Sequence, residues 1–210
     1  MSAVACILGG CCIAAFVLVH PWGQLMGAAI ARTPRWQLAH TLHFVGALLA
    51  SAGLIGIYLY QRERLGLFGL IGFAVAFAGN AMFVGTGMIT AFIWPMLAVC
   101  APATVELGGP IFRGPQSALA FLFTAVAIIV GYIAFGAAML RAGVMPRFAT
   151  AMLVVGAILG MSPPYPLSPI PWAALVLGGT LYGGALIWFG LILLKENSDF
   201  GLAARTQHDG

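Results

Sequence analysis

Residues 117–140 read SALAFLFTAVAIIVGYIAFGAAML, an apolar run of 24 residues without a charged side chain. A helix needs about 20 apolar residues to cross the roughly 30 Å hydrocarbon core of a bilayer. Lipid cannot satisfy free backbone donors and acceptors, so a run of this length is expected to form its hydrogen bonds internally as a helix. The stretch therefore predicts a transmembrane helix.

The rest of the chain repeats this pattern. It is 62% hydrophobic and 7% charged, whereas a soluble domain carries about 25% charged residues. We therefore expect an all-α, polytopic transmembrane bundle of about six spans, formed as one domain by residues 1–194 and followed by a polar cytoplasmic tail, 195–210. The expected spans are 3–20, 36–60, 67–94, 117–140, 148–162 and 172–194.

The basic residues predict an orientation. Loops on the cytoplasmic side carry an excess of Lys and Arg. With six spans, one side holds Arg62, Arg64, Arg141, Arg147, Lys195 and Arg205, and the other holds Arg32, Arg35 and Arg113. Both termini are therefore expected inside the cell, in a bacterial cytoplasmic (inner) membrane. The loops 24–35, 99–116 and 162–171 are expected to face outward.

Partners follow from the same composition. The basic residues are scattered over short loops and form no cluster that would grip phosphates, so lipid is the expected partner and nucleic acid is not. The 28 glycines lie largely inside the spans. Small-residue stripes let helices approach closely in lipid. We expect them to serve packing within the bundle, with a homo-oligomer or a larger membrane complex as the alternative.

Three histidines are the main site candidates. His20 closes the first span, and His40 and His43 lie one helical turn apart near the outer end of the second. All three could meet at one depth. Neutral imidazoles in an apolar site suit haem iron or another metal, so His20, His40 and His43 are candidate cofactor-binding residues. Hydrogen bonding to loop carbonyls or lipid head groups at the interface is the alternative.

A second candidate site is a polar pocket made by Asn80, Glu106 and Arg113. Asn80 is the one amide near the middle of a span, and Glu106 is the only carboxylate expected on the outer side, with Arg113 in the same loop. Polar groups within a membrane are costly and mark functional sites or helix–helix contacts. No carboxylate pair or cluster typical of acid/base catalysis is visible.

Several short motifs of glycine and helix-end residues resemble those of a known group of proteins. The residues His20-Pro21, Trp36-x-x-x-His40, Gly66-Leu67-x-Gly69-Leu70-x-Gly72-Phe73 and Arg141-Ala142-Gly143-x-x-Pro146-Arg147-Phe148 are similar to those of a group of small multi-span bacterial membrane proteins of unknown function. The resemblance covers most of the chain and implies a six-span fold. It implies no activity.

Three functions are consistent with these features. The first is a membrane binding or accessory protein with an outward-facing pocket at the three histidines, for haem, a metal, a quinone or another lipophile. The second is a small transporter or permease-like protein with Asn80 lining its path. The third is a membrane-embedded enzyme acting on a lipid or isoprenoid, with Glu106 and a histidine as acid and base. The scarcity of polar residues at mid-depth places the enzyme last.

Overall fold

Helices make up all the regular structure that is described. The computed structural model describes the backbone of residues 1–22, 27–161 and 172–208, and the side chains of these ranges up to residue 196. The all-α prediction is confirmed for them, since they contain no strand. The elements are α1 (Ser2–Val19), α2 (Ala28–Ala31), α3 (Pro34–Met88), the π-helix η1 (Ile89–Ile93), α4 (Trp94–Cys100), the 3₁₀-helix η2 (Pro102–Thr104), α5 (Pro110–Arg113), α6 (Pro115–Ala142), α7 (Arg147–Gly160) and α8 (Trp172–His208).

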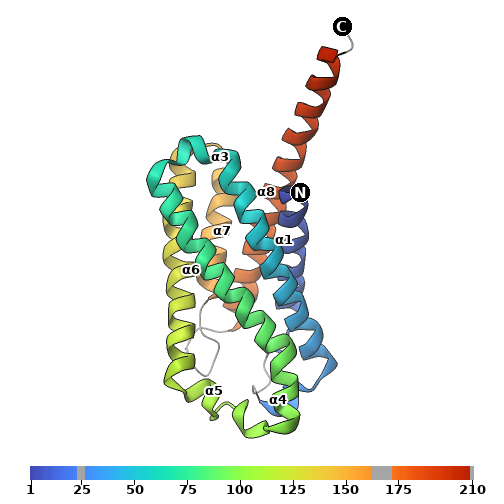
Figure 1. Ribbon diagram of the computed structural model, residues 1–210, viewed down its shortest axis with the longest axis vertical. Helices are drawn as coiled ribbons and strands as arrows, with labels where there is room; N and C mark the ends of the chain where they lie inside the picture. The colour runs from blue at the N-terminus through green and yellow to red at the C-terminus, as the bar shows by residue number, and fades with distance from the viewer. Residues whose placement is uncertain (23–26, 162–171, 209–210) are drawn as a thin grey trace.

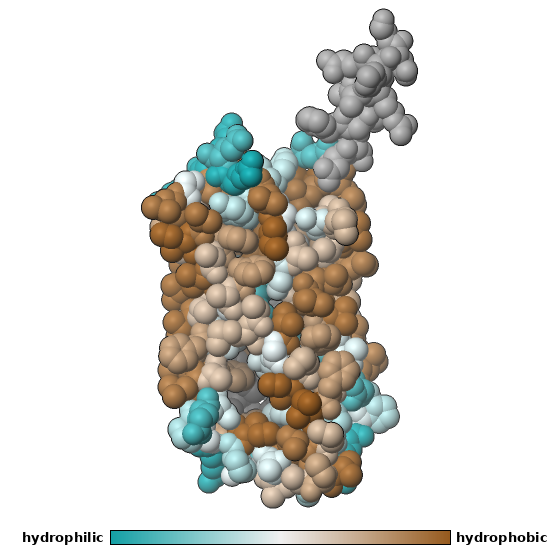
Figure 2. Space-filling model, in the orientation of Figure 1, coloured by the Kyte–Doolittle hydropathy of each residue, from teal (hydrophilic) through white to brown (hydrophobic). Residues whose placement is uncertain are grey.

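Four helical stretches are long and apolar enough to cross a membrane. They are Ser2–Val19, the continuous stretch Pro34–Cys100, Pro115–Ala142 and Trp172–Glu196. The helix α7 is apolar but shorter, with 14 residues. Figure 2 shows a broad apolar band over the side of the bundle, with polar residues gathered at its two ends. This distribution is that of an integral membrane protein, whose apolar side faces lipid and whose ends face water.

The long helix α3 doubles back on itself at Gly66. A straight helix of its 55 residues would be about 80 Å long, far more than a bilayer is thick. Gly66 instead adopts φ 61° and ψ −171° inside the helix, a conformation open essentially to glycine alone. Figure 1 shows the two resulting arms running side by side in opposite directions.

Contacts between the two arms pair residues that lie about equally far from Gly66 along the chain, one on each side. Near it, Tyr58 stacks on Phe73 with ring centroids 4.4 Å apart. Farther along, a Cβ at Gly87 would lie 2.9 Å from the Cα of Phe44. At the far end, Trp36 stacks on Trp94 of α4 at 5.4 Å. The residues 34–65 and 67–88 therefore form an antiparallel helical hairpin.

A π-helical turn interrupts the second arm just before Pro95. Proline has no N–H, so the carbonyl one turn earlier loses its helical donor. The carbonyl of Thr90 accepts a hydrogen bond from the indole Nε1 of Trp36 at 3.0 Å. This bond ties the end of the second arm to the beginning of the first.

Glycines bring the helices of the bundle into close contact. A Cβ at Gly72 would lie 2.5 Å from the backbone nitrogen of Phe135, and one at Gly79 would lie 2.7 Å from that of Ile128, both in α6. A Cβ at Gly156 of α7 would similarly lie 2.5 Å from the nitrogen of Tyr182 in α8. These glycines therefore serve packing within one chain, where lipid supplies no hydrophobic drive between helices.

The C-terminal segment is helical. The helix α8 continues through the polar residues after 194 as far as His208, and Figure 1 shows this extension projecting beyond the bundle. The expected outward loop 162–171 and part of the loop 24–35 lie outside the described residues.

Candidate functional site

The structure brings the three predicted histidines together at one end of the bundle. His20 follows the last turn of α1, and its backbone N–H donates to the carbonyl of Phe16 at 2.9 Å. His40 and His43 lie in the first arm of α3. The ring centroids of His20 and His40 are 5.1 Å apart, and those of His40 and His43 are 6.1 Å apart. All three side chains are at most 5% exposed.

Aromatic rings surround this cluster on several sides. Trp22 and Trp36 each lie with their ring centroid 4.0 Å from a histidine, His20 and His40 respectively. Phe83, from the second arm of α3, lies 4.2 Å from His43. We refer to His20, His40 and His43 with Phe16, Trp22, Trp36 and Phe83 as the histidine–aromatic cluster.

Phe16 occupies the centre of the histidine–aromatic cluster. Its ring stacks on His43 with centroids 4.8 Å apart and planes 22° apart. The same ring lies edge-on to His20 at 5.5 Å and tilted against His40 at 5.7 Å. Phe16 is thus in contact with all three imidazoles.

The imidazoles of this cluster differ from the neighbouring indoles in their hydrogen bonding. Nε1 of Trp22 donates to the carbonyl of Val17 at 2.6 Å, and Nε1 of Trp36 donates to that of Thr90. In contrast, Nδ1 of His20 and both ring nitrogens of His40 and His43 are buried without a hydrogen-bond partner among the described residues. Buried polar atoms in proteins are nearly always paired, so each exception requires an explanation. Five buried nitrogens at one place mark this cluster as the candidate site.

The cluster fits a metal less well than the sequence suggests. In the described part of the chain, no three His, Cys, Asp or Glu side chains are placed to hold one ion. Sulfur side chains are further metal ligands that the sequence places toward the outer ends of the spans. Met88, Met96 and Cys100 are exposed, Met161 is buried in the main hydrophobic core, and Met26 lies outside the described residues. A metal bound by all three imidazoles would have to lie between them. The ring of Phe16 lies there instead, against each of the three.

Asn80 has a different set of partners. Its Oδ1 accepts from the hydroxyl of Tyr132 in α6 at 3.2 Å, and its Nδ2 donates to the hydroxyl of Tyr182 in α8 at 3.4 Å. The two tyrosine hydroxyls also bond to each other. Asn80, Tyr132 and Tyr182 are all buried. This closed triangle joins three helices and gives both polar atoms of Asn80 a partner, as a contact that links helices does.

Glu106 and Arg113 do not share a site with Asn80. Oε1 of Glu106 accepts a hydrogen bond from the backbone nitrogen of Ala28, the first residue of α2, at 3.1 Å. A carboxylate at a helix N-terminus satisfies a free N–H. Arg113 is the last residue of α5, and its side chain is exposed. The three residues proposed as one polar pocket therefore have separate contacts.

Several partners in these clusters were missed from the sequence. Phe16 lies four residues before His20, and Trp36 lies four residues before His40, so helical spacing could have placed both beside their histidines. Phe83 comes from the other arm of α3, and Tyr132 and Tyr182 come from α6 and α8, so no short sequence spacing indicates them. Comparison of the chain with protein-family models, with curated proteins and with solved structures finds no match.

Proposed function

We propose that this protein is a membrane-embedded binding protein whose ligand is held at the histidine–aromatic cluster. The single observation that carries this proposal is the set of five buried ring nitrogens without partners. A neutral imidazole offers one donor and one acceptor. The ligand class that suits it here is a lipophile with a flat ring bearing carbonyl or hydroxyl groups, as in a quinone.

Aromatic neighbours support this ligand class. A flat ring gains by stacking on Trp or Phe side chains in an offset or edge-on arrangement. Trp22 and Trp36 have their own N–H groups bonded to carbonyls, so a ligand would meet their rings alone; Trp22 is half-buried, whereas Trp36 is fully buried in the cluster. Imidazole nitrogens would then form hydrogen bonds with the ligand's oxygens. Because a neutral imidazole both donates and accepts, the site would bind a ligand with carbonyl oxygens or one with hydroxyl groups.

The proposal includes a topology. We propose six spans with both termini inside the bacterial cytoplasmic membrane, counting each arm of α3 and the short helix α7 as one span. The doubling back at Gly66 supports this count. The histidine–aromatic cluster then lies at the outer end, and association with further copies or other membrane proteins stays a prediction from the glycine content.

Quenching of tryptophan fluorescence tests the function. Full-length protein in detergent is titrated with a short-chain benzoquinone, which quenches Trp22 and Trp36 if it binds beside them. The wild type should show saturable quenching. His40→Phe keeps a buried ring but removes both nitrogens, and it should weaken binding by roughly tenfold, the effect of one or two hydrogen bonds.

Tyr58→Phe is the matched control, since it removes one polar group at the opposite end of the hairpin and should bind as the wild type does. Equal binding by wild type and His40→Phe would overturn the site. Co-purification of haem or of stoichiometric metal that is lost in His40→Phe would overturn the ligand class.

A further inference from the structure

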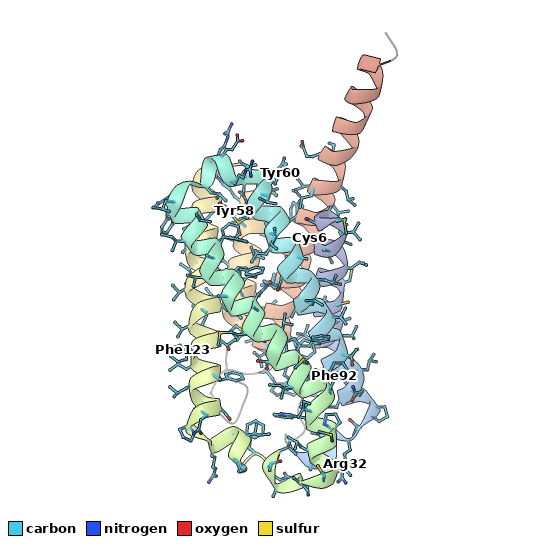
Figure 3. All side chains as sticks on the ribbon, viewed as in Figure 1. Cys6, Arg32, Tyr58, Tyr60, Phe92 and Phe123 are labelled. Carbon is cyan, nitrogen blue, oxygen red and sulfur yellow. The ribbon has the colours of Figure 1, made fainter. Side chains whose placement is uncertain are left out.

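A pocket lies at the other end of the bundle, beside the fold-back of α3. Its lining is the run from Leu59 to Arg64 and Val144 from the turn between α6 and α7. Figure 3 shows Tyr60 and Arg32 at opposite ends of the molecule, so this pocket is remote from the beginning of α3 where the histidines lie. The proposal below is independent of the histidine–aromatic cluster.

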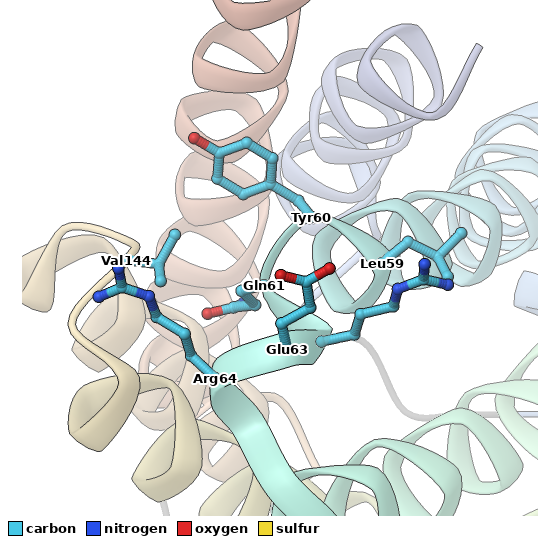
Figure 4. A pocket seen from close by; sticks show the side chains of 7 residues that line it. Leu59, Tyr60, Gln61, Glu63, Arg64 and Val144 are labelled. Atoms are coloured by element: carbon cyan, nitrogen blue, oxygen red, sulfur yellow. The ribbon is translucent and has the colours of Figure 1, made fainter.

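The pocket combines opposite charges in a small space. Arg62 and Arg64 contribute guanidinium groups, and Glu63 contributes a carboxylate between them in sequence. Figure 4 shows Arg64 reaching toward Val144, with Gln61 and Glu63 lying between Arg64 and Tyr60. Guanidinium groups match phosphate oxygens, which they bind with two parallel hydrogen bonds. A carboxylate in the same pocket favours a ligand that also has a positive charge.

Gln61 gives this pocket a buried acceptor. Its side chain is 2% exposed. Nε2 donates to the carbonyl of Ile57 at 3.2 Å, while Oε1 is buried without a partner among the described residues. A buried carbonyl oxygen that lacks a donor costs free energy. A ligand with an N–H group would satisfy it.

Apolar surface continues directly from the pocket. Leu67, Phe68 and Ile71, which follow the fold-back, are 71%, 48% and 54% exposed. Arg141 lies over the ring of Phe68 at 5.5 Å from its centroid, which adds a cation at the same level. A free phosphate would leave this surface unused, but the acyl chains of a lipid would lie along it.

We propose that the pocket at Leu59–Arg64 and Val144 binds the head group of a phospholipid that carries both a phosphate and a primary amine, as phosphatidylethanolamine does. Arg64 holds the phosphate, Arg62 adds positive charge to the same pocket, and Glu63 and the Oε1 of Gln61 accept from the ammonium. A choline head has no N–H to donate to Gln61, and a glycerol head has no positive charge for Glu63. The amine head is therefore preferred to both.

Native mass spectrometry of the full-length protein in detergent tests this assignment. The protein is mixed with equal amounts of phosphatidylethanolamine, phosphatidylcholine and phosphatidylglycerol that share the same acyl chains. The wild type should retain the ethanolamine lipid over the choline lipid by roughly threefold or more, the effect of one modest hydrogen bond. Equal retention of the three lipids by the wild type would overturn the proposal without any variant.

Variants separate the two halves of the head-group site. R62Q/R64Q should lose retention of all three lipids, whereas Gln61→Leu should keep lipid bound but lose the preference for ethanolamine over choline. R32Q/R113Q is the matched control, because it removes the same charge at the other end and should behave as the wild type does. Wild-type retention by a folded R62Q/R64Q protein would contradict the site.

Soluble phosphoethanolamine distinguishes a lipid from a small water-soluble ligand. Added at the concentration of the lipid, it should leave the bound ethanolamine lipid in place, since it lacks the acyl chains that contact Leu67, Phe68 and Ile71. Displacement at comparable concentration would show that the pocket takes a soluble phosphate compound, and the lipid assignment would be wrong.

Discussion

At the scale of single residues, hydrogen-bond partners distinguish the buried polar groups from one another. Asn80, Tyr132 and Tyr182 satisfy each other across three helices. The imidazoles of His40 and His43 are as deeply buried, yet their nitrogens have no partner. A paired network in a membrane stabilises the fold, whereas an unpaired group there is costly and needs another reason to be present. Asn80 therefore contributes to stability, and the unpaired histidines are the residues for which we propose a role in binding.

Tyr132→Phe tests the structural half of this assignment. The change removes the hydroxyl that donates to Asn80 and leaves the ring in place, so unfolding should become easier by about 1 kcal/mol, the usual size of such a bond between membrane helices. Unfolding in mixed detergent micelles measures the loss. Tyr58→Phe, whose ring stacks on Phe73, should change stability much less. An unaltered unfolding curve for Tyr132→Phe would assign the triangle no stabilising role.

At the scale of elements, the hairpin of α3 is the main finding. One residue, Gly66, reverses the chain. The first arm contributes to both the histidine–aromatic cluster and the lipid pocket, and the second arm contributes Phe83 to the cluster. The arms are held by ring stacking along their length and by the bond from Trp36 to Thr90 at their far end. The second arm is also packed on α6 through glycines.

Gly66→Ala should destabilise the protein by about 1–3 kcal/mol because an L-residue rarely adopts this backbone conformation. No heavy atom lies within 4 Å of the added Cβ, so the effect is purely conformational. Gly85→Ala, in the same helix and also in open space, should be neutral or slightly stabilising because alanine favours helix. Thermal unfolding of the two variants in one detergent measures the difference. Equal midpoints would mean that the reversal does not depend on glycine.

Gly79→Ala should destabilise by on the order of 1–3 kcal/mol for a different reason, overpacking. Its Cβ would lie 2.7 Å from the backbone nitrogen of Ile128, so the second arm of α3 and α6 would have to move apart. Size-exclusion chromatography and thermal unfolding report the change, with Gly85→Ala again as control. Tolerance of Gly79→Ala without loss of stability would indicate that this helix contact adjusts freely.

At the scale of the whole molecule, the two proposed sites lie at opposite ends of an apolar bundle. The polar ends and the apolar side in Figure 2 indicate which surfaces meet water and which meet lipid. Basic residues gather at the fold-back end, where the positive-inside bias places the cytoplasm. In the topology that we propose, the histidine–aromatic cluster would face the outside and the lipid pocket would face the cytoplasmic leaflet.

Cys100 provides a native test of this orientation. It is exposed at the end of α4, whereas Cys6 is buried. The exposed Cys11 and the half-buried Cys12 lie in the middle of α1, where lipid would keep a water-soluble reagent away from them. A membrane-impermeant maleimide should label wild-type spheroplasts, and Cys100→Ser should abolish that labelling. Arg64→Cys, introduced into the Cys100→Ser protein, should be labelled only after the membrane is permeabilised. Labelling of that variant in intact spheroplasts would reverse the proposed topology.

The sequence predicts much of the fold because lipid restricts the choices. Long runs without charge, such as residues 117–140, must be helical in a membrane, and the all-α fold follows. The sequence did not predict that Gly66 would adopt a positive φ, since glycines elsewhere in the same arms are helical. It did not predict the π-helical turn, because the carbonyl of Thr90 needs Trp36, many residues away, as its partner.

The candidate site was predictable in part for the same reason. His40 and His43 share a helical face, and His20 ends a helix on the expected side, so their meeting could be anticipated. The position of Phe16 against all three rings depends on how α1 packs against α3, and the tyrosine partners of Asn80 depend on α6 and α8. Packing between helices that are distant in sequence is not encoded in local spacing.

The symmetric contacts of the α3 hairpin have a consequence for assembly. Pairs near Gly66, such as Tyr58 and Phe73, are close along the chain, whereas His43 and Phe83 are farther apart and Trp36 and Trp94 farther still. Closing a short loop costs less entropy than closing a long one. We therefore expect the hairpin to form first next to Gly66, and its histidine-bearing end to close last.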